Sequence, residues 1–88
     1  MKVAFLASFL RDIRKLKNRA VQHSIEAAIQ SVEETNAINQ IASIKRLSGH
    51  TNFYRLRVGD YRLGMKLEKD TLVFVRCLHR REIYRFFP

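Results

Sequence analysis

The fold is decided by the stretch Phe53-Tyr54-Arg55-Leu56-Arg57-Val58-Gly59-Asp60-Tyr61-Arg62-Leu63. Apolar and polar side chains alternate on both sides of Gly59-Asp60, a dipeptide typical of a two-residue hairpin turn. The pattern predicts strands over residues 53–58 and 61–68. Side chains alternate between the faces of a sheet, so one face receives Tyr54, Leu56, Val58, Tyr61, Leu63, Met65 and Leu67. The opposite face receives the basic set Arg55, Arg57, Arg62 and Lys66.

A third strand is predicted over residues 71–78, after the turn Glu68-Lys69-Asp70. Its residues are apolar on both sides, which is typical of a central strand. We assign the purely apolar set to the face that packs on the helices; it comprises Val73, Val75 and Cys77. The other set, Leu72, Phe74 and Arg76, then falls on the opposite face, and this turns Arg76 toward the basic side chains.

The first half of the chain has helical periodicity instead. Residues 2–7 predict an edge strand, and Ser8 is placed to cap a helix whose apolar positions are Leu10, Ile13 and Leu16. Asn18 marks a break before a second helix over about 19–34, which completes a hairpin with one apolar side. Residues 36–52 predict a helical turn or a tethered loop, and residues 80–87 a short helix closed by Phe86-Phe87. The predicted order is β-α-α-β-β-β-α, in one α+β domain over residues 1–88.

The positive charge is concentrated in the second half. The chain carries a net charge of +9; residues 1–44 hold six basic and four acidic residues, and residues 45–88 hold eleven basic and four acidic. An uneven charge indicates a binding surface for nucleic acid, an anionic membrane or an acidic protein. A single strand arginine is best interpreted as a solvated side chain. Arg55, Arg57, Arg62 and Arg76 together favour a phosphate site.

His79 and Tyr84 are the candidates for further chemistry. Imidazole titrates near neutral pH, and a bend between strand and helix would bring His79 and Tyr84 to one site. The histidines and Cys77 lack metal-ligand spacing, so we expect neither a metal nor another cofactor. A lone cysteine and the lack of an apolar run of membrane-spanning length predict a cytoplasmic protein without a disulfide.

Four stretches of this sequence together resemble the RelE/ParE toxin superfamily. They are Ile44-Lys45-Arg46-Leu47, then residues 53–63 as quoted above, then Val73-Phe74-Val75-Arg76, and finally His79-Arg80-Arg81-Glu82-Ile83-Tyr84. The resemblance spans nearly the whole chain. It implies a microbial RNase-like fold, in which a twisted antiparallel sheet carries the helical hairpin on one face.

The resemblance also implies an activity and partners. RelE-like members cleave messenger RNA in the ribosomal A site, and their strand cations contact the scissile phosphate. Arg55, Arg57 and Arg62 match those strand positions, while Tyr84, His79 and either Arg80 or Arg81 match the C-terminal cations, tyrosine and histidine. We assign Arg81 to catalysis, and the further RNA-binding cations are Lys45, Arg46, Lys66, Arg76, Arg80 and Arg85. The acidic base of some relatives has no counterpart here. The implied partners are the ribosome and a cognate antitoxin, with no membrane.

The leading hypothesis is a metal-independent endoribonuclease of a type II toxin–antitoxin system. The substrate's 2′-hydroxyl would attack phosphorus and leave a 2′,3′-cyclic phosphate, with His79 transferring protons and Tyr84 orienting the ribose or stacking on a base. A ParE-like inhibitor of DNA gyrase without nuclease activity is the first alternative. A plain RNA-binding module is the second.

Overall fold

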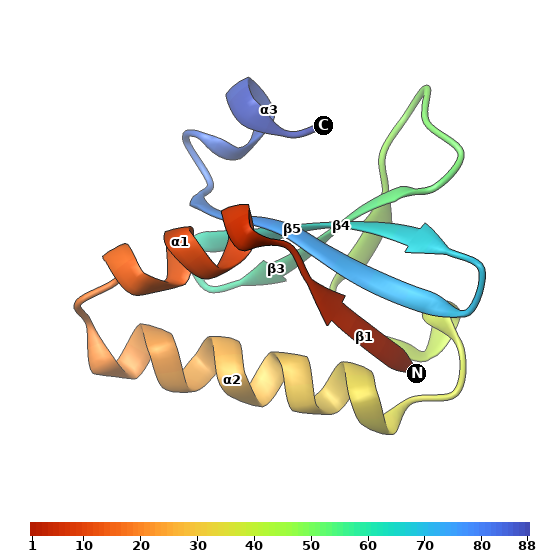
Figure 1. Ribbon diagram of the computed structural model, residues 1–88, viewed down its shortest axis with the longest axis horizontal. Helices are drawn as coiled ribbons and strands as arrows, with labels where there is room; N and C mark the ends of the chain where they lie inside the picture. Colours follow the sequence, from red (N-terminus) through yellow and green to blue (C-terminus); the bar gives the residue numbers. More distant parts are fainter.

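A computed structural model describes all residues, Met1–Pro88. The elements run in the order β1 (Lys2–Phe5), α1 (Ala7–Lys15), α2 (Arg19–Glu34), a 3₁₀ turn (Ile38–Gln40), β2 (Ile44–Arg46), β3 (Phe53–Val58), β4 (Tyr61–Glu68), β5 (Thr71–His79) and α3 (Ile83–Phe86). The strands form one sheet in the order β1-β5-β4-β3-β2. α1 and α2 cover one face, and the C-terminal segment with α3 lies on the other side (Figure 1). The α+β class and the element order are confirmed.

Two features of the sheet differ from the expectation. β1 pairs with β5 in parallel, from Lys2 opposite Thr71 to Phe5 opposite Phe74, so the sheet is mixed. Residues 36–52 contain the 3₁₀ turn and also the edge strand β2, which pairs with β3. A strand of three residues is too short for alternation to reveal it in the sequence.

The core lies between the helical hairpin and the sheet. Phe9, Ile25 and Val32 bring the apolar sides of the two helices onto Leu63 and Phe74 of the central strands. The predicted break at Asn18 is confirmed, because its side-chain oxygen accepts a hydrogen bond from the Val21 amide at 3.1 Å. Ser8 does not cap α1, which begins after Leu6; its hydroxyl instead donates to the Val75 carbonyl at 2.6 Å.

A β-bulge corrects the predicted faces of β5. The β4–β5 register shifts between Gly64 and Met65, so Gly64 pairs with Arg76 and Met65 with Phe74, and Val75 is left without a partner. Because Val75 is an extra residue in β5, the residues that precede it point to the faces opposite to those predicted. Leu72 and Phe74 therefore belong to the core with Cys77, and Val73 lies opposite Lys66 on the other face. The assignment was right for Cys77 and wrong for Val73, Leu72 and Phe74.

The C-terminal segment forms a small second apolar cluster on the face away from the helices. Ile83 is 0% and Phe87 3% exposed, and the Phe87 ring meets Phe53 edge-on at 5.5 Å between centroids. Of the predicted pair that closes the terminus, Phe87 is buried, whereas Phe86 is 54% exposed. None of the helices has the length and apolar character needed to cross a membrane.

Candidate phosphate-binding site

The three hairpin arginines lie together on the sheet face opposite the helical hairpin. Arg57 and Arg62 are direct cross-strand partners, and Arg55 lies opposite Gly64, next along the same face. Their neighbours Leu56 and Leu63 point the other way and are buried in the core. We call Arg55, Arg57 and Arg62 the arginine cluster. Its shared face is the geometry predicted from alternation.

Electrostatic repulsion within the arginine cluster is not compensated by an acid. The pKa of Arg62 is lowered, first by partial desolvation and then by the charges of Arg55 and Arg57, with a smaller contribution from Arg80. The four ion pairs of the structure involve other cations: Lys2, Lys66, Arg76 and Arg80. Like charges opposed across strands destabilise a sheet, so the arrangement is suited to an anion that binds all three guanidinium groups.

Arg62 is held in place by the hairpin turn itself. Its Nη1 donates to the Gly59 carbonyl at 2.8 Å and to the Tyr61 carbonyl at 3.0 Å. Gly59 has a φ of +58°, which a glycine adopts without strain and which a two-residue turn requires. The backbone carbonyls at the turn therefore orient the Arg62 guanidinium. No carboxylate is needed for this, so the positive charge is not neutralised.

Tyr84 brings a hydroxyl group to the arginine cluster from α3. The Nε of Arg55 donates to the Tyr84 hydroxyl oxygen at 3.1 Å. Tyr84 is 60% exposed, although Ile83 beside it is fully buried. The ring is thus presented to solvent by a buried anchor, and its hydroxyl remains able to donate its own proton.

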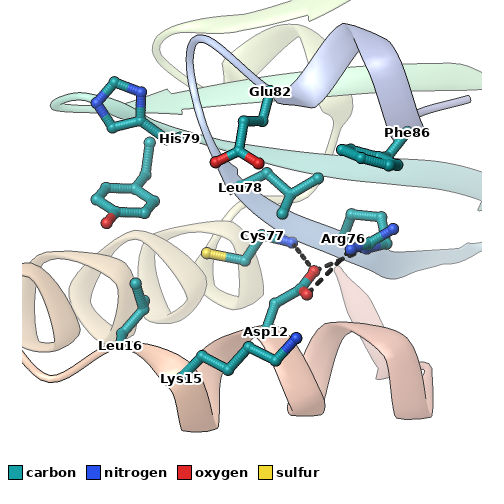
Figure 2. A pocket seen from close by; sticks show the side chains of 10 residues that line it. Asp12, Lys15, Leu16, Arg76, Cys77, Leu78, His79, Glu82 and Phe86 are labelled. Carbon is teal, nitrogen blue, oxygen red and sulfur yellow. Dashed lines mark hydrogen bonds and ion pairs between the residues drawn. The ribbon is translucent and has the colours of Figure 1, made fainter.

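Arg76 does not join the arginine cluster. Its backbone pairs with Gly64, but its side chain reaches Asp12 on α1 (Figure 2). Nε and Nη2 donate to the Asp12 carboxylate at 2.8 and 3.1 Å, and the hydrogen bonds with Asp12 raise the pKa of Arg76. Asp12 is 6% exposed and also accepts from the Cys77 amide at 2.9 Å. The prediction that the Arg76 side chain lies on the basic face is therefore wrong.

Asp12 is a residue that sequence reasoning missed, although the signal was present. It follows Phe9 by three residues and precedes Leu16 by four, so it lies on the apolar side of α1. A carboxylate on such a side is buried only with a partner, and Arg76 is that partner. The guanidinium also lies 5.7 Å from the centroid of the Phe86 ring, a cation–π contact that links the ion pair to α3.

His79 and Tyr84 are not brought together. β5 continues to His79, one residue beyond the predicted end, so the alternation places His79 opposite Tyr61 on the helix-facing side. The two rings meet edge-on at 5.6 Å, and Nδ1 of His79 accepts from the Arg81 amide at 3.2 Å. Figure 2 shows His79 beside a pocket that Asp12 and Glu82 also line. The expected single site of imidazole and phenol is thus not observed, and the role of His79 in proton transfer stays a prediction.

The remaining predicted cations divide between the two faces. Lys45 lies opposite Arg55 and extends the arginine cluster toward β2, whereas Arg46 lies opposite Tyr54 on the helix-facing side. Arg80 contributes to the lowered pKa of Arg62 and pairs with Asp60 at 3.7 Å.

Three further cations lie outside the arginine cluster. Lys66 is paired with Glu68 at 2.8 Å. Arg81 and Arg85 are exposed and make no ion pair. Of Arg80 and Arg81, Arg80 is the one whose charge contributes to the lowered pKa of Arg62.

Comparisons with known proteins identify the family and the fold of this chain. The pattern of the ParE toxin of type II toxin–antitoxin systems (parDE) matches residues 3–84. Toxin RelE3 of Methanocaldococcus jannaschii is 37% identical over 89 residues, which cover the full length of both chains. The RelB–RelE antitoxin–toxin complex of Methanococcus jannaschii contains a chain with a TM-score of 0.79 and 34% identity, covering 97% of this chain and 99% of that one. The RelBE2 toxin–antitoxin complex of Mycobacterium tuberculosis gives 0.69 and 26%, with 90% and 96% covered. The chain therefore belongs to the ParE toxin family within the RelE/ParE superfamily, the toxins of type II toxin–antitoxin systems.

Proposed function

We propose that this toxin is a metal-independent endoribonuclease that cleaves messenger RNA on the translating ribosome. One observation carries the proposal: Arg55, Arg57 and Arg62 converge on one sheet face with no carboxylate partner, and the Tyr84 hydroxyl lies 3.1 Å from Arg55. Guanidinium groups bind phosphate oxygens through paired hydrogen bonds and remain charged at any physiological pH. Three of them can stabilise the charge that develops on a phosphodiester during attack, and the hydroxyl group can form a hydrogen bond with the ribose.

In the proposed reaction the arginine cluster holds the scissile phosphate. The 2′-hydroxyl of the substrate loses its proton and attacks phosphorus; the bond from phosphorus to the 5′-oxygen breaks, and the 5′-oxygen takes a proton. The products are a 2′,3′-cyclic phosphate and a 5′-hydroxyl. Charge that develops on the phosphate oxygens is stabilised by the three guanidinium groups, each worth about 3–4 kcal/mol. We assign Tyr84 to the ribose side, where its hydroxyl, oriented by Arg55, contacts the attacking oxygen.

We propose that the ribosome holds the substrate. The arginine cluster is an open surface, so it cannot bend a flexible RNA into the in-line geometry that the attack requires. Lys45 and Arg80 lie at two borders of the cluster and would contact neighbouring phosphates. The relative from Methanococcus jannaschii is bound to its RelB antitoxin, and we propose that a cognate antitoxin likewise binds this chain and blocks the cluster in the cytoplasm.

The test is cleavage of a defined message in a reconstituted translation system, with new 5′ ends mapped by primer extension. We expect cuts only within the translated frame and a 2′,3′-cyclic phosphate on the upstream fragment. An RNA that is bound but never cut would instead indicate a binding module. Cleavage that requires a divalent metal ion at the scissile phosphate would also contradict the mechanism.

Inhibition of DNA gyrase is the second candidate, because the matched family is named for ParE toxins. In this case the basic face would contact gyrase or its DNA and would perform no chemistry. A supercoiling assay with purified gyrase separates the two functions. Stalled gyrase complexes together with an uncut message would replace the nuclease proposal with this one.

A further inference from the structure

We propose that Gly64 and Phe87 form a contact that positions Tyr84 over the arginine cluster, so that Gly64 is a positioning residue for the cleavage step. The inference rests on the proposed nuclease function for its catalytic consequence. The position of Tyr84 set by the Gly64–Phe87 contact does not depend on that function and can be measured separately. The sequence predicts that Phe87 helps to close the C-terminus, but it assigns no part in the reaction to Phe87 or to Gly64.

Gly64 is required for space and not for backbone conformation. It lies inside β4 without a positive φ, so other residues could adopt its backbone geometry. A Cβ atom at this position would lie 2.6 to 2.9 Å from three carbon atoms of the Phe87 ring, well inside van der Waals contact. The ring therefore lies directly on the glycine, and any side chain there would displace it.

Phe87 in turn fixes the single turn that carries Tyr84. Its amide donates to the Ile83 carbonyl at 2.8 Å, which closes the turn around Tyr84. Ile83 and Phe87 are both buried, whereas Tyr84 between them points to solvent and accepts the hydrogen bond from Arg55. The two buried anchors leave the turn little freedom to rotate.

A single cross-strand pair receives both contacts. Gly64 of β4 and Arg55 of β3 are direct partners; Phe87 packs on the first, and the Tyr84 hydroxyl binds the second. A displacement of Phe87 is therefore transmitted to the hydroxyl over one helical turn. A methyl group on Gly64 needs about 3.5–4.0 Å to the ring carbons, so the ring must retreat by about 1 Å. A hydrogen bond of 3.1 Å stretched by that amount is lost.

The test compares Gly64→Ala with the parent toxin in the translation system. A misplacement of about 1 Å lowers the rate of a positioned reaction about 100-fold, so we expect kcat to fall by that factor while the ribosome concentration for half-maximal cleavage stays unchanged. Gly64→Ala combined with Phe87→Leu should recover at least tenfold of the loss, because the smaller side chain leaves room for the methyl group. In a Tyr84→Ala background, Gly64→Ala should cost less than threefold, since the group it misplaces is gone.

Three outcomes overturn the inference. They are a folded Gly64→Ala variant that cleaves at the parental rate, a full 100-fold loss in the Tyr84→Ala background, and no recovery with Phe87→Leu. Should Gly64→Ala fail to fold, Phe87→Ala carries the same test, because it removes the anchor without adding an atom to the sheet. If the parent cuts no message, the Arg55 Nε–H signal in ¹⁵N NMR still decides the geometry. The inference requires that its chemical shift and slow solvent exchange change in Gly64→Ala as they do in Tyr84→Phe, and an unchanged signal refutes it.

Discussion

Arg62→Ala is the substitution that best separates function from stability. Arg62 donates two hydrogen bonds, both to carbonyl groups of the exposed hairpin turn. Each contributes about 1 kcal/mol to the free energy of unfolding. The same guanidinium is repelled by Arg55, Arg57 and Arg80, as its lowered pKa reflects. Each repulsion between solvated charges is worth up to about 1 kcal/mol and has the opposite sign. The terms offset one another, so stability should change by less than about 1 kcal/mol.

The effect of Arg62→Ala on cleavage should be far larger. Loss of one preorganised donor to a developing oxyanion costs about 3–4 kcal/mol, which corresponds to a 10²–10³-fold decrease in rate. The assay is single-turnover cleavage of a translated message, with thermal melting and ribosome pelleting of the same samples. Arg11→Ala is the matched control, because it removes the same charge from an exposed position on α1. A folded Arg62→Ala protein that cleaves as fast as the Arg11→Ala control would exclude Arg62 from the site.

Further predictions concern the ion pair, the pocket beside it and the salt dependence. Asp12→Ala leaves the Arg76 guanidinium without its acceptor and should lower the free energy of unfolding by about 3 kcal/mol in urea, whereas removal of both partners should cost less than the single change. Burial, reinforced by Asp12, raises the pKa of the Cys77 thiol to about 12, so stability should fall as pH rises from the ordinary range of a thiol toward 12; maleimide should label the folded protein far more slowly than the unfolded one at pH 8. The role of His79 in proton transfer is tested by His79→Ala: because the imidazole lies against Tyr61 on the helix-facing side, we expect cleavage to slow less than tenfold, and a 100-fold loss would support the proton-transfer role instead. Affinity for ribosomes should fall steeply between 50 and 200 mM salt, and a flat response would contradict phosphate contacts.

Much of the fold followed from local patterns. Alternation around Gly59-Asp60 predicted β3, β4 and the common face of Arg55, Arg57 and Arg62, because the period of a strand fixes side-chain direction residue by residue. Helical spacing predicted the hairpin, and Asn18 its break, although in the first helix Phe9 enters the core and the predicted Leu10 is exposed. These features depend only on residues close in sequence.

The errors arise where a contact between distant segments decides the outcome. The bulge beside Gly64 reverses the faces of β5 before Val75, although a glycine inside a strand was a signal for it. The side chain of Arg76 leaves the face that its register assigns, because a buried carboxylate 64 residues away offers two hydrogen bonds. β5 ends at His79, one residue later than predicted. The strand alternation therefore places the His79 ring on the opposite side of the sheet from Tyr84.

The positions of the acidic side chains restrict the free positive charge to the proposed phosphate site. Arg76, Arg80 and Lys66 are each paired with a carboxylate, from Asp12, Asp60 and Glu68. Lys66 follows Gly64 on the same face of β4, and the charge of Arg80 contributes to the lowered pKa of Arg62, whereas the Arg76 side chain reaches Asp12 on α1. A cation that is paired with a carboxylate attracts a polyanion less strongly than the guanidinium groups of the arginine cluster, which have no carboxylate partner. If the proposed nuclease function is right, we therefore expect an RNA on this face to bind first at the Arg57–Arg62 pair and not over the whole basic half of the chain.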